Sequence, residues 1–312
     1  MKIYIHIDSK STYIGNGGLI TLTNLATKLI EMGYETYIFD QNNTLTQEKI
    51  RWIDLDNLPP ITKTNQIRLD GSSRIITCWL RTLPDKLRKP RNLRFLESSE
   101  LLRKGHEAER EWLIKNKVKI ANLHSHLKSL YKLLGVTDMI DLDVWIREDV
   151  KQYGNITRLE NSVGIQLEKK TFLKFFKVYD WSRYGLFRNE NLIICNGTYR
   201  QVISKMNMAD FFIHNPRPSP HIPYFRGETF GLPLFEAMAC GCVCIARKHE
   251  GIKFLDGTIP LVKDMQEAKE ILTQLKNDKK EKEEIRIRSL TFIEKNYRFN
   301  DERRNAILRW LE

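Results

Sequence analysis

The pattern of apolar and polar positions in the first forty residues predicts one repeat of an α/β sheet. Lys2 to Asp8 reads as a strand, and a polar, glycine-rich loop follows over 11–18. Apolar positions from Leu19 to Met32 then recur at helical spacing, and Thr36 to Phe39 predicts the next strand. A strand, loop, helix and strand in this order indicate a parallel sheet, which binds ligands at the carboxyl ends of its strands.

Similar patterns continue along the chain and predict two such sheets. In the first half, strands are expected over 74–80, 93–96 and 119–123, with a helix over 126–134. In the second half, strands are expected over 192–195, 243–246 and 259–262, with a helix over 201–208 and mostly helix from Met265 onward.

The most informative segment is Gly227 to Ala246, GETFGLPLFEAMACGCVCIA. Gly231 permits a tight turn, Pro233 suits the first turn of a helix, and Gly241 is suited to end that helix. The helix between them is apolar almost all round, and Val243 to Ala246 reads as a buried strand. We therefore predict a turn, a short buried helix and a strand.

Two carboxylates, Glu228 and Glu236, lie in this apolar segment and need polar partners. A sugar diol is one such partner, because a carboxylate accepts hydrogen bonds from both hydroxyls, as in dinucleotide folds. Free backbone N–H groups around Phe230 and Gly231 suit a phosphate.

Composition limits the class of protein. The chain has 312 residues, a net charge of +12, five cysteines and no run of 18 apolar residues. These values indicate about two soluble domains, no spanning helix, and a reducing, cytoplasmic location. The positive charge favours an anionic partner, which could be a diphosphate donor, an acidic membrane surface or nucleic acid.

The residues of the 227–246 segment also carry a family resemblance. Glu228-x7-Glu236, with Phe-Gly-Leu-Pro between the glutamates and Ala-Met-Ala-Cys-Gly after them, resembles the donor-site signature of family 4 glycosyltransferases. This resemblance implies the GT-B fold, in which two Rossmann-like domains face each other across a central cleft. It implies an acceptor-side domain over 1–145, a nucleotide-sugar domain over 146–295, and a helix over 296–312 that crosses back to the first domain.

The resemblance also assigns roles. Glu236 would bind the nucleotide ribose, and Glu228, the expected catalytic residue, would contact the transferred sugar. The backbone of the segment Phe230, Gly231 and Leu232 would hold the diphosphate together with Arg158. The glycine loop with Gly17 and Gly18 would approach the donor phosphates or the acceptor.

The sequence departs from the family pattern at two places. The expected diphosphate lysine falls at Val163, so Lys169 or Lys170 would have to replace it. The segment expected to carry a histidine on the first domain, 95–100, has none, which leaves Glu97 or Glu100 as the candidate there.

The function implied by the resemblance is a metal-independent, retaining transfer of a hexosyl or pentosyl group from a nucleotide-diphosphate sugar to a hydroxyl, without a cofactor. The acceptor is expected to be a cell-envelope glycan or glycolipid, with the enzyme cytoplasmic or peripheral to the inner membrane. An alternative acceptor is DNA with hydroxylated bases, as in bacteriophage glycosyltransferases. The stretch 81–104 has eight basic residues against three acidic ones, which would attract phosphates of either acceptor. A third hypothesis is a scaffold that binds nucleotide sugar or nucleic acid without turnover.

Three other patterns compete with this interpretation. Two DxD triplets, Asp54-Leu-Asp56 and Asp141-Leu-Asp143, would bind a divalent cation in the GT-A architecture. The run Cys240-x-Cys-x-Cys244 could suggest a metal site, but alternation in a strand favours buried small residues. His124 and His126 are expected to be structural.

Overall fold

The computed structural model describes residues 1–8, 17–46, 59–97, 100–102, 105–166, 169–172, 176–179, 184–216 and 230–312. The chain divides into two compact units. Unit 1 contains Met1–Val144 and returns to take Asn300–Glu312, and unit 2 contains the described residues between Trp145 and Phe299. The expected boundaries at 145 and 296 lie close to these divisions.

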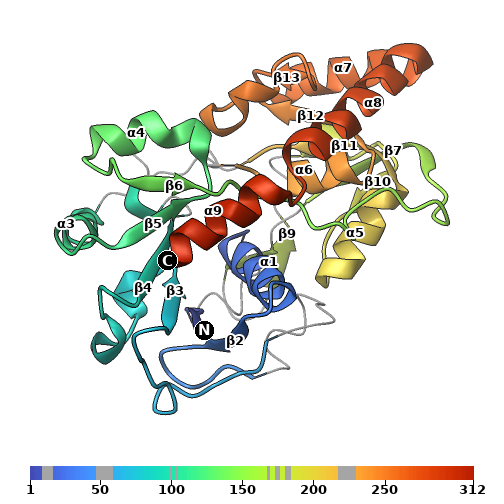
Figure 1. Cartoon of the computed structure of the whole chain (residues 1–312). Helices are drawn as coiled ribbons and strands as arrows, with labels where there is room; N and C mark the ends of the chain where they lie inside the picture. The colour runs from blue at the N-terminus through green and yellow to red at the C-terminus, as the bar shows by residue number, and fades with distance from the viewer. Residues whose placement is uncertain are drawn as a thin grey trace. The chain divides into compact units, whose positions relative to one another are not determined.

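Unit 1 is a parallel six-stranded sheet in the order β2-β1-β3-β4-β5-β6 (Figure 1). Its strands are β1 (Lys2–His6), β2 (Glu35–Phe39), β3 (Arg74–Thr77), β4 (Leu93–Glu97), β5 (Lys119–Asn122) and β6 (Met139–Asp141), and its helices are α1 (Gly17–Glu31), α3 (Glu107–Lys115), α4 (Lys128–Leu133) and α9 (Asp301–Leu311). Leu19, Leu22, Leu25 and Leu29 of α1 are fully buried, as their helical spacing predicts.

The C-terminal helix α9 is attached to unit 1 by specific contacts. The indole nitrogen of Trp310 donates to Lys119 O at 3.1 Å. The buried guanidinium of Arg94, on β4, donates through Nε to Trp310 O and through Nη2 to Leu311 O. These bonds satisfy carbonyls at the end of α9 that have no partner within the helix.

Unit 2 is a second parallel sheet, with the order β10-β7-β11-β12-β13, and an additional antiparallel hairpin of β8 and β9. Its elements are β7 (Leu159–Ile165), β8 (Lys169–Phe172), β9 (Phe176–Tyr179), β10 (Leu192–Ile194), α5 (Tyr199–Met208), β11 (Ala209–His214), α6 (Leu232–Ala239), β12 (Val243–Arg247), β13 (Leu261–Val262), α7 (Met265–Asn277) and α8 (Lys279–Asn296).

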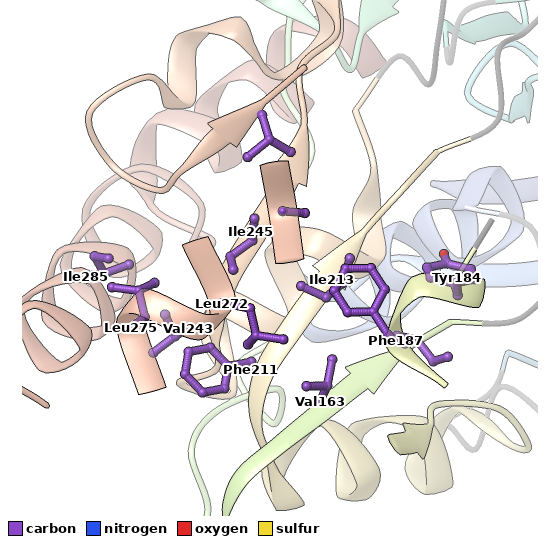
Figure 2. Close-up of a cluster of buried hydrophobic side chains, with 13 residues drawn as sticks. Val163, Tyr184, Phe187, Phe211, Ile213, Val243, Ile245, Leu272, Leu275 and Ile285 are labelled. Carbon is purple, nitrogen blue, oxygen red and sulfur yellow. The ribbon is translucent and has the colours of Figure 1, made fainter. Parts of the chain in front are cut away.

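One hydrophobic cluster of unit 2 lies on one face of its sheet. Figure 2 shows side chains of the strands, such as Val163, Phe211 and Ile245, gathered with Leu272 and Ile285 from α7 and α8. All five are 2% exposed or less. The strands therefore read as nearly continuous apolar runs, as expected for a parallel sheet covered on both faces.

An ion-pair cluster attaches α8 to the amino end of β11. Asp210 is 2% exposed, and its carboxylate binds Lys282 Nζ at 3.0 Å and Arg286 Nη2 at 2.6 Å. It also accepts a hydrogen bond from Asn161 N at 2.9 Å. The buried carboxylate is thus compensated by two cations and a backbone donor, which a buried charge requires.

Candidate functional site

In unit 2 the strand order changes direction at β7. β10 lies on one side of β7 and β11 on the other, so the sheet has its topological switch point between β7 and β11. Open parallel sheets bind ligands at the carboxyl ends of their strands beside such a point. Helix α6 follows β11 and α5 follows β10, so the first residues of both helices belong to this edge.

The turn, helix and strand predicted for the 227–246 segment are confirmed over the described residues. Gly231 is the N-cap of α6 in a left-handed conformation, with φ of 76°, and Pro233 occupies the first turn. Gly241, with φ of 78°, ends the helix before β12. A residue with a Cβ is disfavoured at such positive φ values, which explains both glycines.

Glu236 is the fifth residue of α6, so it lies in the second turn of that helix. It is 3% exposed, and its Oε1 accepts a hydrogen bond from the hydroxyl of Tyr199 at 2.6 Å. Burial raises the pKa of Glu236 to about 7, although the bond from Tyr199 and the charge of Arg147 act in the opposite direction. The carboxylate is therefore poised to change its charge near neutral pH.

Tyr199 begins α5, and a capping box between Thr198 and Gln201 determines where that helix starts. The Arg147 guanidinium lies 5.1 Å from the centre of the Tyr199 ring and also pairs with Asp149. Burial raises the pKa of Tyr199 well above its ordinary value, and Glu236 raises it further. The phenol therefore stays protonated and acts as a hydrogen-bond donor.

Phe230 and Leu232 flank Gly231 and are both nearly buried, at 5% and 8% exposure. The Phe230 ring stacks on Phe235, with centroids 4.0 Å apart. Both rings also lie near Tyr297. This aromatic cluster packs against the start of α6.

The second predicted carboxylate, Glu228, lies outside the described residues. Gly17 and Gly18 are the first two residues of α1 in unit 1. Four of the predicted site residues therefore lie within α6 or at its start in unit 2: Phe230, Gly231, Leu232 and Glu236.

Arg158, which was predicted to hold the diphosphate, contacts backbone carbonyls in the structure. Its guanidinium donates to Ala209 O and, at 2.8 Å, to Cys240 O. Ala209 begins β11 and Cys240 follows the end of α6, so Arg158 lies at the amino edge of the sheet. Helix α6, with eight residues, is about 12 Å long. Arg158 therefore satisfies backbone carbonyls at the end of the sheet opposite to the expected diphosphate.

The two lysines that are candidates for binding the diphosphate lie in a different part of unit 2 from Arg158. Lys169 and Lys170 begin β8, directly after the carboxyl end of β7. Val163, at the family's lysine position, is fully buried in the core of β7.

In unit 1, the carboxylate of Glu97 is bound by hydrogen bonds from within the protein. It is fully buried and accepts hydrogen bonds from Leu101 N, at 3.3 and 3.2 Å, and from the Tyr131 hydroxyl at 3.0 Å. His124 follows the neighbouring strand β5. Burial lowers the pKa of His124 to about 3, so this histidine stays neutral. The side chain of Glu100 lies outside the described part.

The competing metal motifs are not supported where the structure describes them. Asp141 pairs with Lys128, and Asp143 caps Ser125 N at 2.9 Å. Cys240, Cys242 and Cys244 are buried free thiols, as expected. Among the described residues no group of three or more His, Cys, Asp or Glu side chains is placed to hold a metal ion. Asp54 and Asp56 fall outside them.

Two features at the carboxyl edges were not identified from the sequence. In unit 1, where the strand order also changes direction, His6 Nδ1 lies 2.9 Å from Thr77 Oγ1 at the ends of β1 and β3. Burial lowers the pKa of His6 to about 4. In unit 2, the rings of His214 and His249 lie 6.2 Å apart. Polar residues at or just beyond the carboxyl ends of apolar strands are the signal that could have indicated both pairs.

Comparisons with known proteins agree with this architecture. The family model described as glycosyl transferases group 1 matches residues 186–289, a third of the chain that includes α5, α6 and Glu236. Among curated proteins no significant sequence match is found. None of the helices in the described ranges is long and apolar enough to span a membrane.

Solved structures extend the likeness to the whole chain. The crystal structure of Anabaena HepE (Alr3699) with UDP-glucose superposes with a TM-score of 0.69 at 12% identity, over 99% of both chains. The same protein with UDP and glucose gives a TM-score of 0.67 at 13% identity, also over 99% of both chains. The chain therefore has the two parallel-sheet α/β domains of the GT-B fold, as predicted, and its segment 186–289 is similar to the group 1 glycosyl transferases.

Proposed function

We propose that the protein transfers a sugar from a nucleotide-diphosphate sugar to a hydroxyl acceptor. The observation that carries this proposal is the environment of Glu236. It is a buried carboxylate near the carboxyl edge of the unit 2 sheet, its hydrogen-bond partner is a hydroxyl, and it lies within the segment that matches the family. A sugar hydroxyl can donate a hydrogen bond to the carboxylate in the same way as the tyrosine hydroxyl does.

In this proposal the ribose of the donor takes the place of the Tyr199 hydroxyl at Glu236 or shares the carboxylate with it. A carboxylate has about four acceptor sites, so Oε2 is available for a second hydroxyl when Tyr199 stays bound. The backbone of Phe230, Gly231 and Leu232 holds the diphosphate at the start of α6, where the helix dipole favours an anion. Lys169 and Lys170 supply the positive charge for which Arg158 was expected.

The chemical step we propose is a metal-independent transfer with retention of configuration. The leaving diphosphate takes the proton of the incoming hydroxyl on the same face of the sugar, and Glu228 contacts the sugar. Stabilising the negative charge that develops on the diphosphate is then the main electrostatic task of the site. Inversion of configuration in the product, measured by NMR of the anomeric proton, would contradict this step.

For the acceptor, we propose a cell-envelope glycan or a glycolipid, with DNA carrying hydroxylated bases as the alternative. A flipped-out base would be required in the second case. An electrophoretic mobility-shift series on duplex DNA separates the two. Binding that weakens steeply with salt favours DNA, whereas absence of binding at low salt removes it.

The donor proposal is tested by a thermal-shift screen over nucleotide-diphosphate sugars, starting with UDP-glucose. We expect one donor to raise the melting temperature, and Glu236→Ala to abolish that rise. Exposed Glu302→Ala, on α9, is the matched control and should leave the rise unchanged. An undiminished shift in Glu236→Ala would contradict the site. Slow hydrolysis of the donor without acceptor distinguishes an enzyme from a non-catalytic scaffold.

A further inference from the structure

Unit 1 contains a basic groove that the proposed transfer does not use. The groove has a volume of about 590 Å³. Its lining residues are Ile67, Arg68, Leu69, Lys86, Leu87, Lys89, Pro90, Arg91 and Asn92. They come from the segments before β3 and β4, so the groove lies toward the amino edge of the unit 1 sheet. The chemistry of a parallel sheet is expected at the opposite, carboxyl edge.

Four cationic side chains line this groove and no carboxylate does. Arg68, Lys86, Lys89 and Arg91 are all exposed to solvent. Among the described ion pairs, some exposed lysines elsewhere have a carboxylate partner, as in Lys253–Glu250 and Lys2–Glu35, whereas none of those pairs involves these four residues. The groove therefore has a concentrated positive charge.

Two acidic side chains adjacent in sequence to the lining residues, Asp70 and Asp85, have other partners, and the four cations of the groove outnumber them. Asp70 accepts hydrogen bonds from the backbone and hydroxyl groups of Ser72 and Ser73, at 2.7 to 2.8 Å. Asp85 pairs with Arg88 at 3.1 Å. On the inner side, Arg74 and Arg94 are bound to carbonyls at the end of α9. Burial and, to a lesser extent, the charge of Arg91 lower the pKa of Arg74, whereas the charge of Asp70 raises it.

The backbone around the groove is held by hydrogen bonds and is therefore preformed. Asn92 N and Leu93 N donate to Lys89 O, at 2.9 Å each. The Asn92 side-chain amide donates to Asp70 O and Ser73 O, at 2.7 Å each. The floor is apolar, because Ile67 and Leu87 are buried. A preformed site loses less conformational entropy on binding than a flexible one.

The shape and lining indicate what kind of anion fits. Single-stranded nucleic acid is bound by aromatic rings beside a long basic track, and this groove has no aromatic lining residue. Its cations surround one concavity, whose volume is in the usual range of small-ligand sites, roughly 300–1,000 Å³. We propose that this groove binds a compact, multiply charged phosphate group, carried either by a lipid headgroup or by a small molecule in solution.

The proposal is tested with the full chain and two charge-reversed variants. Lys86→Glu/Lys89→Glu changes the groove, and Lys115→Glu/Lys132→Glu changes two other exposed lysines of unit 1 by the same total charge. Binding is measured by calorimetry with inorganic pyrophosphate. It is also measured by flotation with vesicles of phosphatidylcholine containing phosphatidic acid, and with phosphatidylcholine alone. Circular dichroism confirms that both variants are folded.

We expect the full chain to bind pyrophosphate, the acidic vesicles or both, with weaker binding at high salt. The groove variant should bind at least about tenfold more weakly, and the control within about threefold of the unmodified chain, because a local charge acts over roughly a Debye length. Binding to acidic vesicles identifies a lipid-borne phosphate, and binding to pyrophosphate alone identifies a soluble one.

Three results would overturn the proposal. They are absence of binding to both probes, equal loss in the two variants, and groove-dependent binding of duplex DNA that is tighter than binding to either probe. The thermal shift with UDP-glucose provides a separate readout, because the groove variant leaves the donor residues intact. The phosphate-binding measurements can therefore be interpreted even if the donor proposal fails.

Discussion

The hydroxyl of Tyr199 donates to the carboxylate of Glu236 across 2.6 Å, which joins the start of α5 to the second turn of α6. Both side chains are nearly buried, and the Arg147 guanidinium lies over the ring of Tyr199. A buried polar group needs a partner, and here each residue supplies the other's. The same hydrogen bond occupies part of the carboxylate on which the proposed donor site depends.

Removing the hydroxyl should therefore destabilise unit 2. Tyr199→Phe leaves a buried acceptor unsatisfied, which typically costs about 1–3 kcal/mol. We expect a loss of this size in urea unfolding at pH 8, and a smaller loss at pH 5.5, where Glu236 is protonated and less costly to bury. Tyr153→Phe is the control, because its hydroxyl bonds only to Asp149 O in a half-buried setting. Equal losses for both variants would contradict the interpretation.

The raised pKa of Glu236 predicts a pH-dependent stability. Between its ordinary value of 4.5 and about 7, the unfolded chain ionises this group while the folded chain keeps it protonated. Stability from this group is therefore greatest below pH 4.5 and falls as pH rises toward 7, by up to about 3 kcal/mol. Glu236→Gln should remove this component. The difference between the two unfolding free energies, measured from pH 4 to pH 8.5, should grow with pH, and a constant difference would refute the assignment.

The same titration should control donor affinity. If only the ionised carboxylate accepts the ribose hydroxyls, affinity for UDP-glucose should increase about tenfold from pH 6 to pH 8. Glu236→Gln should bind more weakly and with little dependence on pH. Calorimetric titration at three pH values measures both effects. A wild-type profile as flat as that of the glutamine variant would argue against direct ribose contact.

The Asp210 cluster should be one of the most sensitive sites in unit 2. Asp210→Asn removes the charge that compensates Lys282 and Arg286, leaving two nearly buried cations. Breaking a buried pair in this way typically costs about 3–5 kcal/mol. Glu160→Gln breaks the exposed pair with Lys279 and should cost under about 1 kcal/mol. Chemical denaturation of the two variants provides the comparison, and similar values would show that α8 is held by packing alone.

Arg94 should determine how firmly α9 is attached to unit 1. Arg94→Met keeps most of the side-chain volume but removes the donors to Trp310 O and Leu311 O. We expect a loss of about 2–4 kcal/mol. Amide hydrogens of residues 301–311 should also exchange faster than in wild type. Arg309→Met, an exposed change on the same helix, should leave exchange unchanged. Slow exchange retained in the Arg94 variant would show that apolar contacts of Trp310 suffice.

Much of the fold was predictable because its elements carry local signals. The apolar spacing of α1, the glycine and proline positions around α6, and the apolar run of β12 all follow from local preferences. Helix α3 was not predicted, since its mean apolar content is low and only Leu113 is buried. The β8–β9 hairpin was also missed, because a two-stranded hairpin depends on pairing between strands.

Individual site residues were harder to predict than elements. The motif identified Glu236, but nothing local indicated that Tyr199, 37 positions earlier, would be its partner. Arg158 was predicted to hold the diphosphate, and no local pattern indicated that its guanidinium would bind the carbonyls of Ala209 and Cys240. Likewise Arg94 was counted within a basic stretch, although it is buried against α9.

By itself, the sequence determined the α/β class, the two successive sheets and the turn, helix and strand around Glu236, because backbone preferences and apolar periodicity act over short distances. The tertiary structure alone decided which polar groups meet. It paired Glu236 with Tyr199, Asp210 with Lys282 and Arg286, and gathered four cations around one groove. The physical reason is that burial and charge compensation depend on neighbours brought together by the sheet order, which no local pattern records.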